Sequence, residues 1–120
     1  MTATPDEIDE FFRALDDLDE ALDANVALTE QMRGRIRELR SARGAGIPLR
    51  ELVSAEAPPL VVQLLTASAT RLQTFGNRVR RTEARALYAE GLTMDQIGRL
   101  FGVTRQRVSA LLRERSDEAA

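Results

Sequence analysis

Apolar side chains recur with a heptad period along the first third of the chain. They are Ile8, Phe11, Leu15, Leu18, Leu22, Met32, Ile36 and Leu39. The same spacing places two polar residues, Asn25 and Thr29, at the centre of the series. This pattern predicts one long helix over about residues 5–41, with an apolar seam that packs as in a coiled coil.

The seam could be covered in two ways. Two copies of the helix could pair between chains, so that the eight apolar residues form a homodimer contact, or the helix could pack on the rest of its own chain. Residues 1–23 carry nine acidic residues and one arginine, a net charge of −8, whereas the second half of the helix carries four arginines. An antiparallel dimer would bring these opposite charges together, with Asn25 and Thr29 near the crossing. The acidic half could instead cover the basic C-terminal region of its own chain.

Composition narrows the range of functions. None of the 120 residues is Cys or His, which removes disulfides, the usual zinc sites and the commonest general base. Residues 24–120 carry sixteen arginines and ten acidic residues, a net charge of +6. An acidic segment joined to a basic body indicates a nucleic-acid partner. No signal-peptide pattern and no apolar run of about 18 residues occurs, so we expect a cytoplasmic, nucleoid-associated protein.

Local signals mark where the regions begin and end. Thr4 is expected to cap the long helix, with Pro5 at the first helical position. The segment from Gly44 to Pro48 is the clearest break in the chain. The expected regions are 1–43, a long helix for dimerisation; 44–77, a linker and helical core; 78–115, a DNA-binding helix-turn-helix; and 116–120, a tail.

The middle region predicts two further helices. A short one would cover residues 48–54, and a second would begin at Pro58-Pro59 and kink or end at Gly76-Asn77. The inward residues of the short helix would be Leu49, Leu52 and Val53. Those of the second would be Val61, Leu65, Ser68, Leu72, Phe75 and Val79. No stretch shows the period-two alternation of a strand, so the predicted fold class is all-α.

Capping residues divide the C-terminal region into three helices. The first covers residues 82–91 and ends at Gly91. Thr93 and Gln96 have the capping-box spacing for a short second helix. Thr104 then caps a third helix that runs to about residue 115.

The spacing between the last two helices is that of a helix-turn-helix. Gly102 supplies the positive φ that the turn needs, and Gly98 is small enough for the point of closest approach. The residues expected to meet between the helices are Ile97, Phe101, Val103, Val108 and Leu111.

The last helix would present a polar outer face. Arg105, Gln106 and Ser109 lie in its first two turns, the part of a recognition helix that enters the major groove. Arg pairs with guanine, Gln pairs with adenine, and Ser donates or accepts, so we expect these three to contact bases. The expected phosphate contacts are Thr104, Arg107, Arg113, Gln96, Arg81 and Arg85. The cluster Arg78, Arg80, Arg81 and Arg85 could equally be a solvated helix face.

The stretch AEGLTMDQIGRLFGVTRQRVSALLRER resembles the C-terminal (region 4) helix-turn-helix of bacterial sigma factors and related transcriptional regulators. The family's recurring pattern is present from Gly102 to Val108, and the resemblance covers about residues 79–115. It implies that the last helix contacts promoter DNA through Arg105, Gln106 and Ser109. Gly98 departs from the alanine that is usual there. Nothing in the chain resembles the sigma domain that melts DNA.

These features favour a sequence-specific DNA-binding transcriptional regulator that acts as a homodimer on double-stranded DNA. The alternative is a protein-interaction module that binds RNA polymerase or a transcription factor. An enzyme is not expected, because no base, metal cluster or phosphate-binding loop accompanies Tyr88 or the serines. We expect no metal, no cofactor and no membrane partner.

Overall fold

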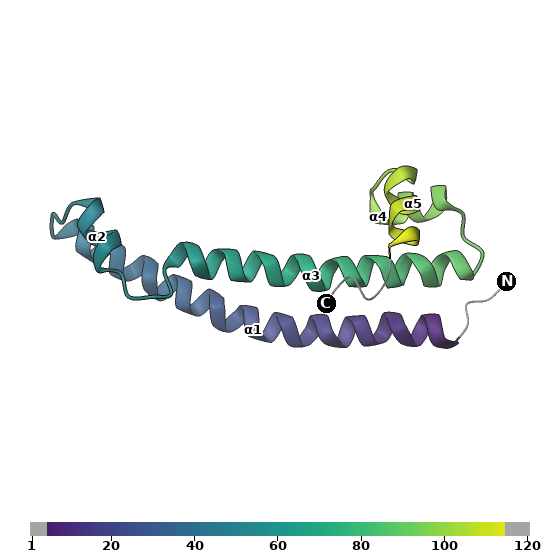
Figure 1. Ribbon diagram of the computed structural model, residues 1–120, viewed down its shortest axis with the longest axis horizontal. Coiled ribbons are helices and arrows are strands. Elements are labelled where there is room, and N and C mark those ends of the chain that lie inside the picture. The colour runs from purple at the N-terminus through teal and green to yellow at the C-terminus, as the bar shows by residue number, and fades with distance from the viewer. Residues whose placement is uncertain (1–4, 115–120) are drawn as a thin grey trace. The chain divides into compact units, whose positions relative to one another are not determined.

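The computed structural model describes residues 5–114, and within this range the chain consists of five α-helices and no strand. The helices are α1 (Pro5–Gly44), α2 (Leu49–Ala55), α3 (Val61–Ala89), α4 (Met94–Phe101) and α5 (Arg105–Arg113) (Figure 1). The all-α class and the long N-terminal helix are confirmed. The expected cap at Thr4, the end of the last helix at residue 115 and the tail over 116–120 lie outside the described residues.

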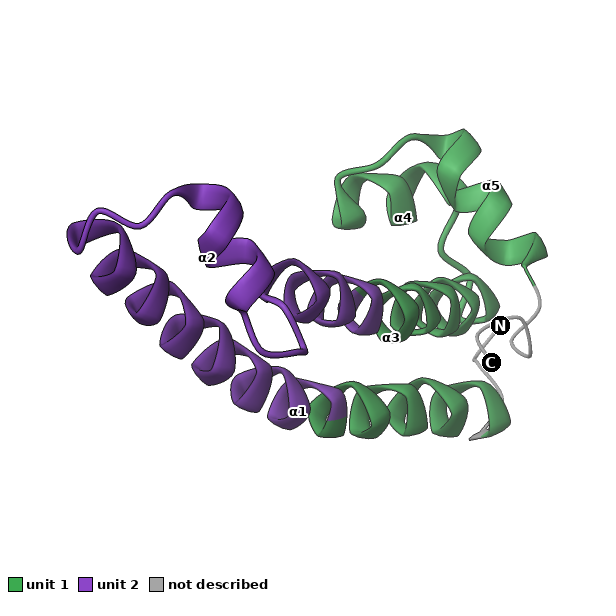
Figure 2. Ribbon diagram, turned by 60° about the vertical axis from the view of Figure 1, so that its left-hand side comes forward, with its two compact units in different colours: residues 1–20, 73–120 green, residues 21–72 purple. Residues whose placement is uncertain are grey.

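The chain divides into two compact units that both include parts of α1 and α3 (Figure 2). Unit 1 comprises residues 1–20 and 73–120, and unit 2 comprises residues 21–72. This division differs from the linear one that the sequence suggested, because each long helix contributes to both units. Each unit therefore contains half of α1 beside half of α3.

The helix α3 is one continuous element of 29 residues. The prediction that it kinks or ends at Gly76-Asn77 is wrong, as is the separate helix expected from residue 82. Thr82 lies inside α3, and its hydroxyl donates to the carbonyl oxygen of Arg78 at 2.8 Å. The intrinsic cost of a mid-helix glycine is only about 1 kcal/mol, which packing of the half-buried residues around it outweighs.

In unit 2, α1 and α3 run antiparallel and meet at a polar contact. Asn25 is 7% exposed, and its side-chain amide donates to the carbonyl oxygen of Ser68 at 3.2 Å. Ala21 and Leu64 are buried around this contact. The polar interruption of the heptad thus lies inside the chain's own helical hairpin, where a buried asparagine favours one register.

The buried side of α1 is centred on alanines rather than on the apolar heptad itself. Ala14 and Ala21 are 1% and 3% exposed, and each directly precedes a heptad leucine. Of the eight predicted seam residues, Leu22 and Ile36 are 43% and 41% exposed, and the others are half-buried. Small side chains allow close approach of two helices, so the alanines determine which side of α1 faces α3.

The inward stripes predicted for α2 and α3 need correction. In the part of α3 that belongs to unit 2, Leu64 is buried, whereas the predicted Leu65 and Leu72 are 59% and 43% exposed. The other predicted residues of α3 are half-buried: Val61, Ser68, Phe75 and Val79. In α2 no residue is buried, and Leu49 and Val53 are 73% and 48% exposed. Leu64 rather than Leu65 is buried because Leu64 lies one helical turn before Ser68, the partner of Asn25, on the same side of α3.

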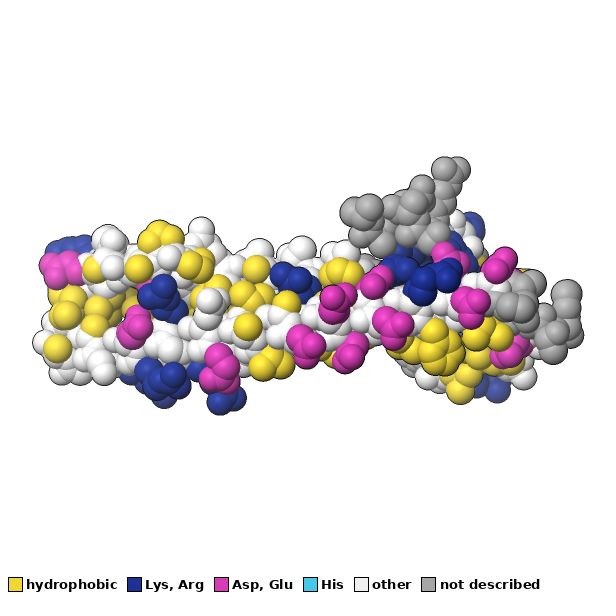
Figure 3. All heavy atoms as spheres, turned by 90° about the horizontal axis from the view of Figure 1, so that it is seen from below, with side chains coloured by type: hydrophobic (Ala, Val, Ile, Leu, Met, Phe, Trp, Pro, Cys, Tyr) yellow, Lys and Arg dark blue, Asp and Glu magenta, His cyan; other side chains and the backbone are white. Residues whose placement is uncertain are grey.

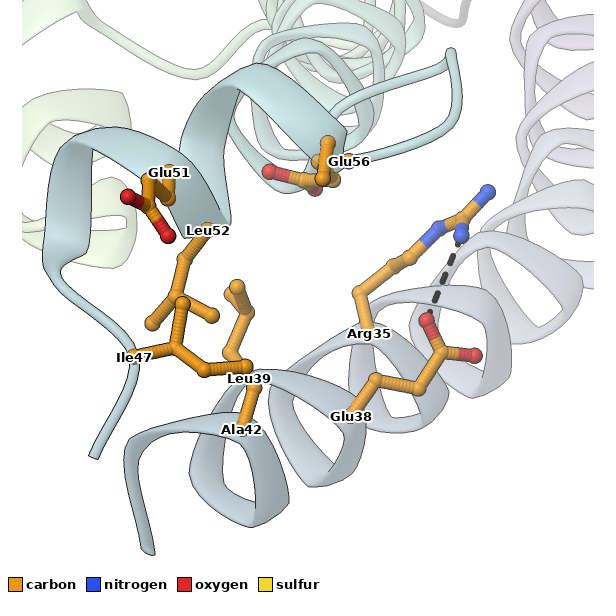
Figure 4. A pocket seen from close by; sticks show the side chains of 9 residues that line it. Arg35, Glu38, Leu39, Ala42, Ile47, Glu51, Leu52 and Glu56 are labelled. Atoms are coloured by element: carbon orange, nitrogen blue, oxygen red, sulfur yellow. Dashed lines mark hydrogen bonds and ion pairs between the residues drawn. The ribbon is translucent and has the colours of Figure 1, made fainter. Parts of the chain in front are cut away.

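Between α2 and the end of α1, unit 2 contains a pocket with a partly apolar wall (Figure 4). Leu39, Ile47 and Leu52 point toward one another at its apolar side. At the other side Arg35 and Glu38 form an ion pair with a distance of 3.3 Å between Nη1 and Oε2.

Among the described helices, none combines the length and apolarity that crossing a membrane requires.

Candidate nucleic-acid interface

The C-terminal half of unit 1 is built around four fully buried aliphatic side chains. Ala84 of α3, Ile97 of α4, and Val108 and Leu111 of α5 are each 0% or 1% exposed. Partly buried side chains surround them: Leu87, Leu92, Met94, Phe101 and Leu112. The inward positions predicted for Ile97, Val108 and Leu111 are confirmed, and Phe101 packs against them, whereas the predicted Val103 is 38% exposed. This core holds α4 and α5 against the end of α3.

The start of α4 has the predicted capping box. The Thr93 hydroxyl accepts from the backbone N–H of Gln96 at 3.1 Å, and the Gln96 side-chain oxygen accepts from the backbone N–H of Thr93 at 2.8 Å. Two otherwise unpaired backbone donors are satisfied in this way. The Gln96 side chain is thus engaged within its own helix.

The turn between α4 and α5 depends on two glycines. Gly102 has φ of 68°, a left-handed conformation that side chains with a Cβ rarely adopt. The carbonyl oxygen of Gly98 accepts from the backbone N–H of Val103 at 2.9 Å. A Cβ on Gly98 would lie 2.9 Å from the carbonyl oxygen of Val103, closer than such atoms pack. The departure from alanine at residue 98 therefore has a structural reason: the turn leaves no room for a methyl group.

The helix α5 begins at a threonine cap and has two distinct sides. The Thr104 hydroxyl accepts from the backbone N–H of Arg107 at 3.1 Å, as predicted. Val108 and Leu111 occupy the buried side. Arg105, Gln106 and Arg113 are exposed on the other side, and Ser109 is half-buried beside them. The three residues expected to contact bases thus share one outward surface, which we call the α5 face together with Arg113.

One carboxylate links α5 to α3. Glu114, directly after α5, pairs with Arg81 at 3.6 Å and with Arg107 at 3.4 Å. The side chain of Arg81 is 5% exposed. Its Nε and Nη2 have no hydrogen-bond partner among the described residues. Arg81 is therefore removed from the expected phosphate contacts, because a buried and paired guanidinium cannot reach a nucleic acid. Arg107 is more accessible, with 42% of its side chain exposed.

The rest of the basic cluster is also partly engaged. Arg78 forms an ion pair and hydrogen bond with Asp17 of α1, so the acidic half of α1 contacts an arginine of its own unit. The Nη1 of Arg80 donates to the side chain of Asn77 at 2.9 Å. Arg85 is half-buried. Of the four arginines in this cluster, Arg78 and Arg81 are thus paired with carboxylates, whereas Arg80 keeps its charge at the surface.

A shallow polar surface lies beside the turn. Asp95, Arg99, Thr104 and Arg105 line it together with the backbone of Gly98 and Gly102. Arg99 and Arg105 make this surface attractive to anions, whereas Asp95 in the first turn of α4 repels anions.

Among residues 5–114, no group of three His, Cys, Asp or Glu side chains could hold a metal ion.

No protein family, no curated protein and no solved structure matches this chain.

Proposed function

We propose that the chain is a sequence-specific DNA-binding transcriptional regulator that inserts α5 into the major groove. One observation carries the proposal. The helix buries Val108 and Leu111 in a core with Ile97 and turns polar side chains outward in its first turns. A helix held in this way by a preceding capped helix can enter the groove, whose width admits an α-helix.

Within this proposal the residues of the α5 face have different roles. Arg105, Gln106 and Ser109 contact base edges, because they lie nearest the start of the helix. Arg113 and Arg107 contact phosphates, and the capped N-terminus at Thr104 adds backbone N–H groups and a positive dipole. Gln96 and Arg85 remain candidate phosphate contacts at the edge of the site.

A single short recognition helix binds DNA weakly, so the regulator would act as a homodimer. Linking two such helices raises affinity through effective concentration. The two half-sites would lie about 34 Å apart along one side of the duplex, or a multiple of that distance.

A second candidate function is binding to RNA polymerase or another transcription protein. It is favoured by apolar exposure on and beside α4, where Leu100 is 66% and Val103 38% exposed. Exposed apolar side chains of this kind would suit a protein partner. Stable binding to polymerase without affinity for any duplex would favour this function over the first.

The test begins with selection of duplexes from a random double-stranded library by the full chain. The selected site is then titrated with wild type and with Arg105→Ala. We expect Arg105→Ala to cost about 1–3 kcal/mol on the selected site and to relax the preference at one base pair. Arg50→Ala is the matched control, since Arg50 is an exposed arginine of α2 and removes the same charge. We expect it to leave affinity nearly unchanged.

Two results would count against the proposal. Failure to enrich any sequence from the library would remove sequence-specific binding. Equal losses for Arg105→Ala on selected and random duplexes would mean that Arg105 contacts only phosphate, and the base-contact role would then be wrong.

A further inference from the structure

Unit 2 exposes a second apolar stripe that its own helices do not cover. On α1 the stripe contains Leu22 and Val26, which are 43% and 64% exposed. On α3 it contains Leu65 and Leu72, which are 59% and 43% exposed. Each of these four residues directly follows one that is buried or half-buried: Ala21, Asn25, Leu64 and Arg71.

The two parts of the stripe lie on the same side of the helical hairpin. Each exposed residue is rotated by about 100° from its inward neighbour, in the same sense along both helices. Because α1 and α3 run in opposite directions, equal rotations turn both sets toward one side. The Asn25–Ser68 contact also places Leu22 and Leu72 at nearly the same level of the hairpin. The result is a contiguous surface, which we call the hairpin face and define as Leu22, Val26, Leu65 and Leu72.

Large apolar side chains that stand alone on a surface need no explanation, but a contiguous set typically marks an interaction site. The nature of the partner follows from the charges along α1. Figure 3 shows acidic side chains gathered along the N-terminal half of this helix and arginines along its C-terminal half. A partner that matches this surface must have the opposite order of charges.

A second copy of the same helix has that order when it runs antiparallel. Val26 lies midway between Asp19 and Arg33, seven residues from each, and the three share one heptad position. With Val26 at a two-fold axis, Asp19 of each chain lies opposite Arg33 of the other. A parallel pair would place Asp19 against Asp19 and Arg33 against Arg33. Neither side chain has an ion-pair or hydrogen-bond partner within the described part of the chain.

We propose that the hairpin face binds the same face of a second copy, antiparallel about Val26, with two symmetric Asp19–Arg33 pairs at its edge. The alternative seam through Asn25 is not the contact, since Asn25 is buried against Ser68 within one chain. The inference deepens the proposed function, because it names the surface that would join the two copies. Its surface and its test involve no DNA, so either proposal can fail without the other.

The apolar part of the proposal is tested by sedimentation equilibrium of the full chain. Val26→Asp should raise the dimer dissociation constant at least tenfold, because it buries an unpaired charge at the axis. Ala27→Asp is the control, since it adds the same charge at the next exposed position, outside the stripe. We expect it to change the constant by less than about threefold. Far-UV circular dichroism confirms that both variants remain helical.

The direction of the dimer is tested by exchanging charges. Asp19→Arg alone faces Arg33 of the partner, and Arg33→Asp alone faces the partner's Asp19, so each variant should dimerise about tenfold more weakly. Mixing the two variants should restore a tight heterodimer, in which both opposed pairs are complementary. The double variant should also recover wild-type affinity.

Several outcomes would overturn the proposal. A wild-type chain that remains monomeric at about 100 µM, where a specific dimer would be populated, lacks the interface. A dimer that tolerates Val26→Asp as well as Ala27→Asp uses another surface. Absence of heterodimer on mixing the two charge variants would exclude the antiparallel arrangement.

Discussion

The α4–α5 region and the hairpin of unit 2 are both helical, but they reach stability in different ways. Around α4 and α5, the large side chains Ile97, Val108 and Leu111 are fully buried, and both helices have side-chain caps. In unit 2 the buried set is small and partly polar, and α2 has neither a buried residue nor a side-chain cap. The first region therefore has the larger buried core, although both regions expose some apolar side chains.

The largest expected difference between the two regions is in the cost of shortening an apolar side chain. Ile97→Ala removes a fully buried side chain and leaves a cavity, so we expect it to lower the free energy of unfolding by about 2–5 kcal/mol. Leu49→Ala in α2 should change it by less than about 0.5 kcal/mol, because Leu49 is 73% exposed. Urea denaturation followed by circular dichroism measures both. Equal losses would mean that the two regions do not differ as described.

Replacing a glycine by alanine should change the free energy of unfolding in opposite directions in the two regions. Gly98→Ala places a methyl group 2.9 Å from the Val103 carbonyl oxygen and should destabilise the fold by about 1–3 kcal/mol. Gly34→Ala lies in the middle of α1 with only the flexible Arg37 side chain nearby. It should stabilise the fold by about 0.5–1 kcal/mol, because alanine favours helix. Thermal unfolding of the pair tests this, and a stabilising Gly98→Ala would show that the turn can open at little cost.

The smallest expected difference between the two regions is in the stability lost when an ion pair is removed. Glu114→Gln removes the carboxylate that neutralises the buried Arg81 and should cost about 1–3 kcal/mol. Glu38→Gln removes the partner of Arg35 in an exposed pair within α1 and should cost less than about 0.5 kcal/mol. When the denaturation experiment is repeated at high salt, we expect the loss of unfolding free energy to become smaller for Glu38→Gln only, because salt screens exposed ion pairs. If both substitutions cost the same, Arg81 does not depend on Glu114.

Local signals predicted α4 and α5 well. The capping box at Thr93 and Gln96, the cap at Thr104 and the left-handed Gly102 each depend on residues at most three positions apart, and such signals can be found in a single sequence. The inward positions of Ile97 and Val108 follow from the same short helices.

What depends on distant contacts could not be predicted in the same way. The burial of Leu64 in place of the predicted Leu65 follows from the pairing of α3 with α1. Arg81 looks in sequence like Arg80 and Arg85, which are exposed and half-buried, and only its contact with Glu114, 33 positions away, identifies it as buried. The alanines of α1 carry little apolar signal, yet they select the side on which the hairpin closes.

The length of α5 limits how many base pairs one chain can specify. Nine residues rise about 13 Å, which matches about four base pairs of a duplex. Four specified pairs recur by chance about once in 256 positions, whereas two such half-sites at a fixed spacing recur about once in 65,000. Under the proposed function, selectivity would therefore come mainly from the distance between the two α5 helices and from their symmetry. The hairpin face, which fixes both, would help to determine which DNA sites the dimer binds.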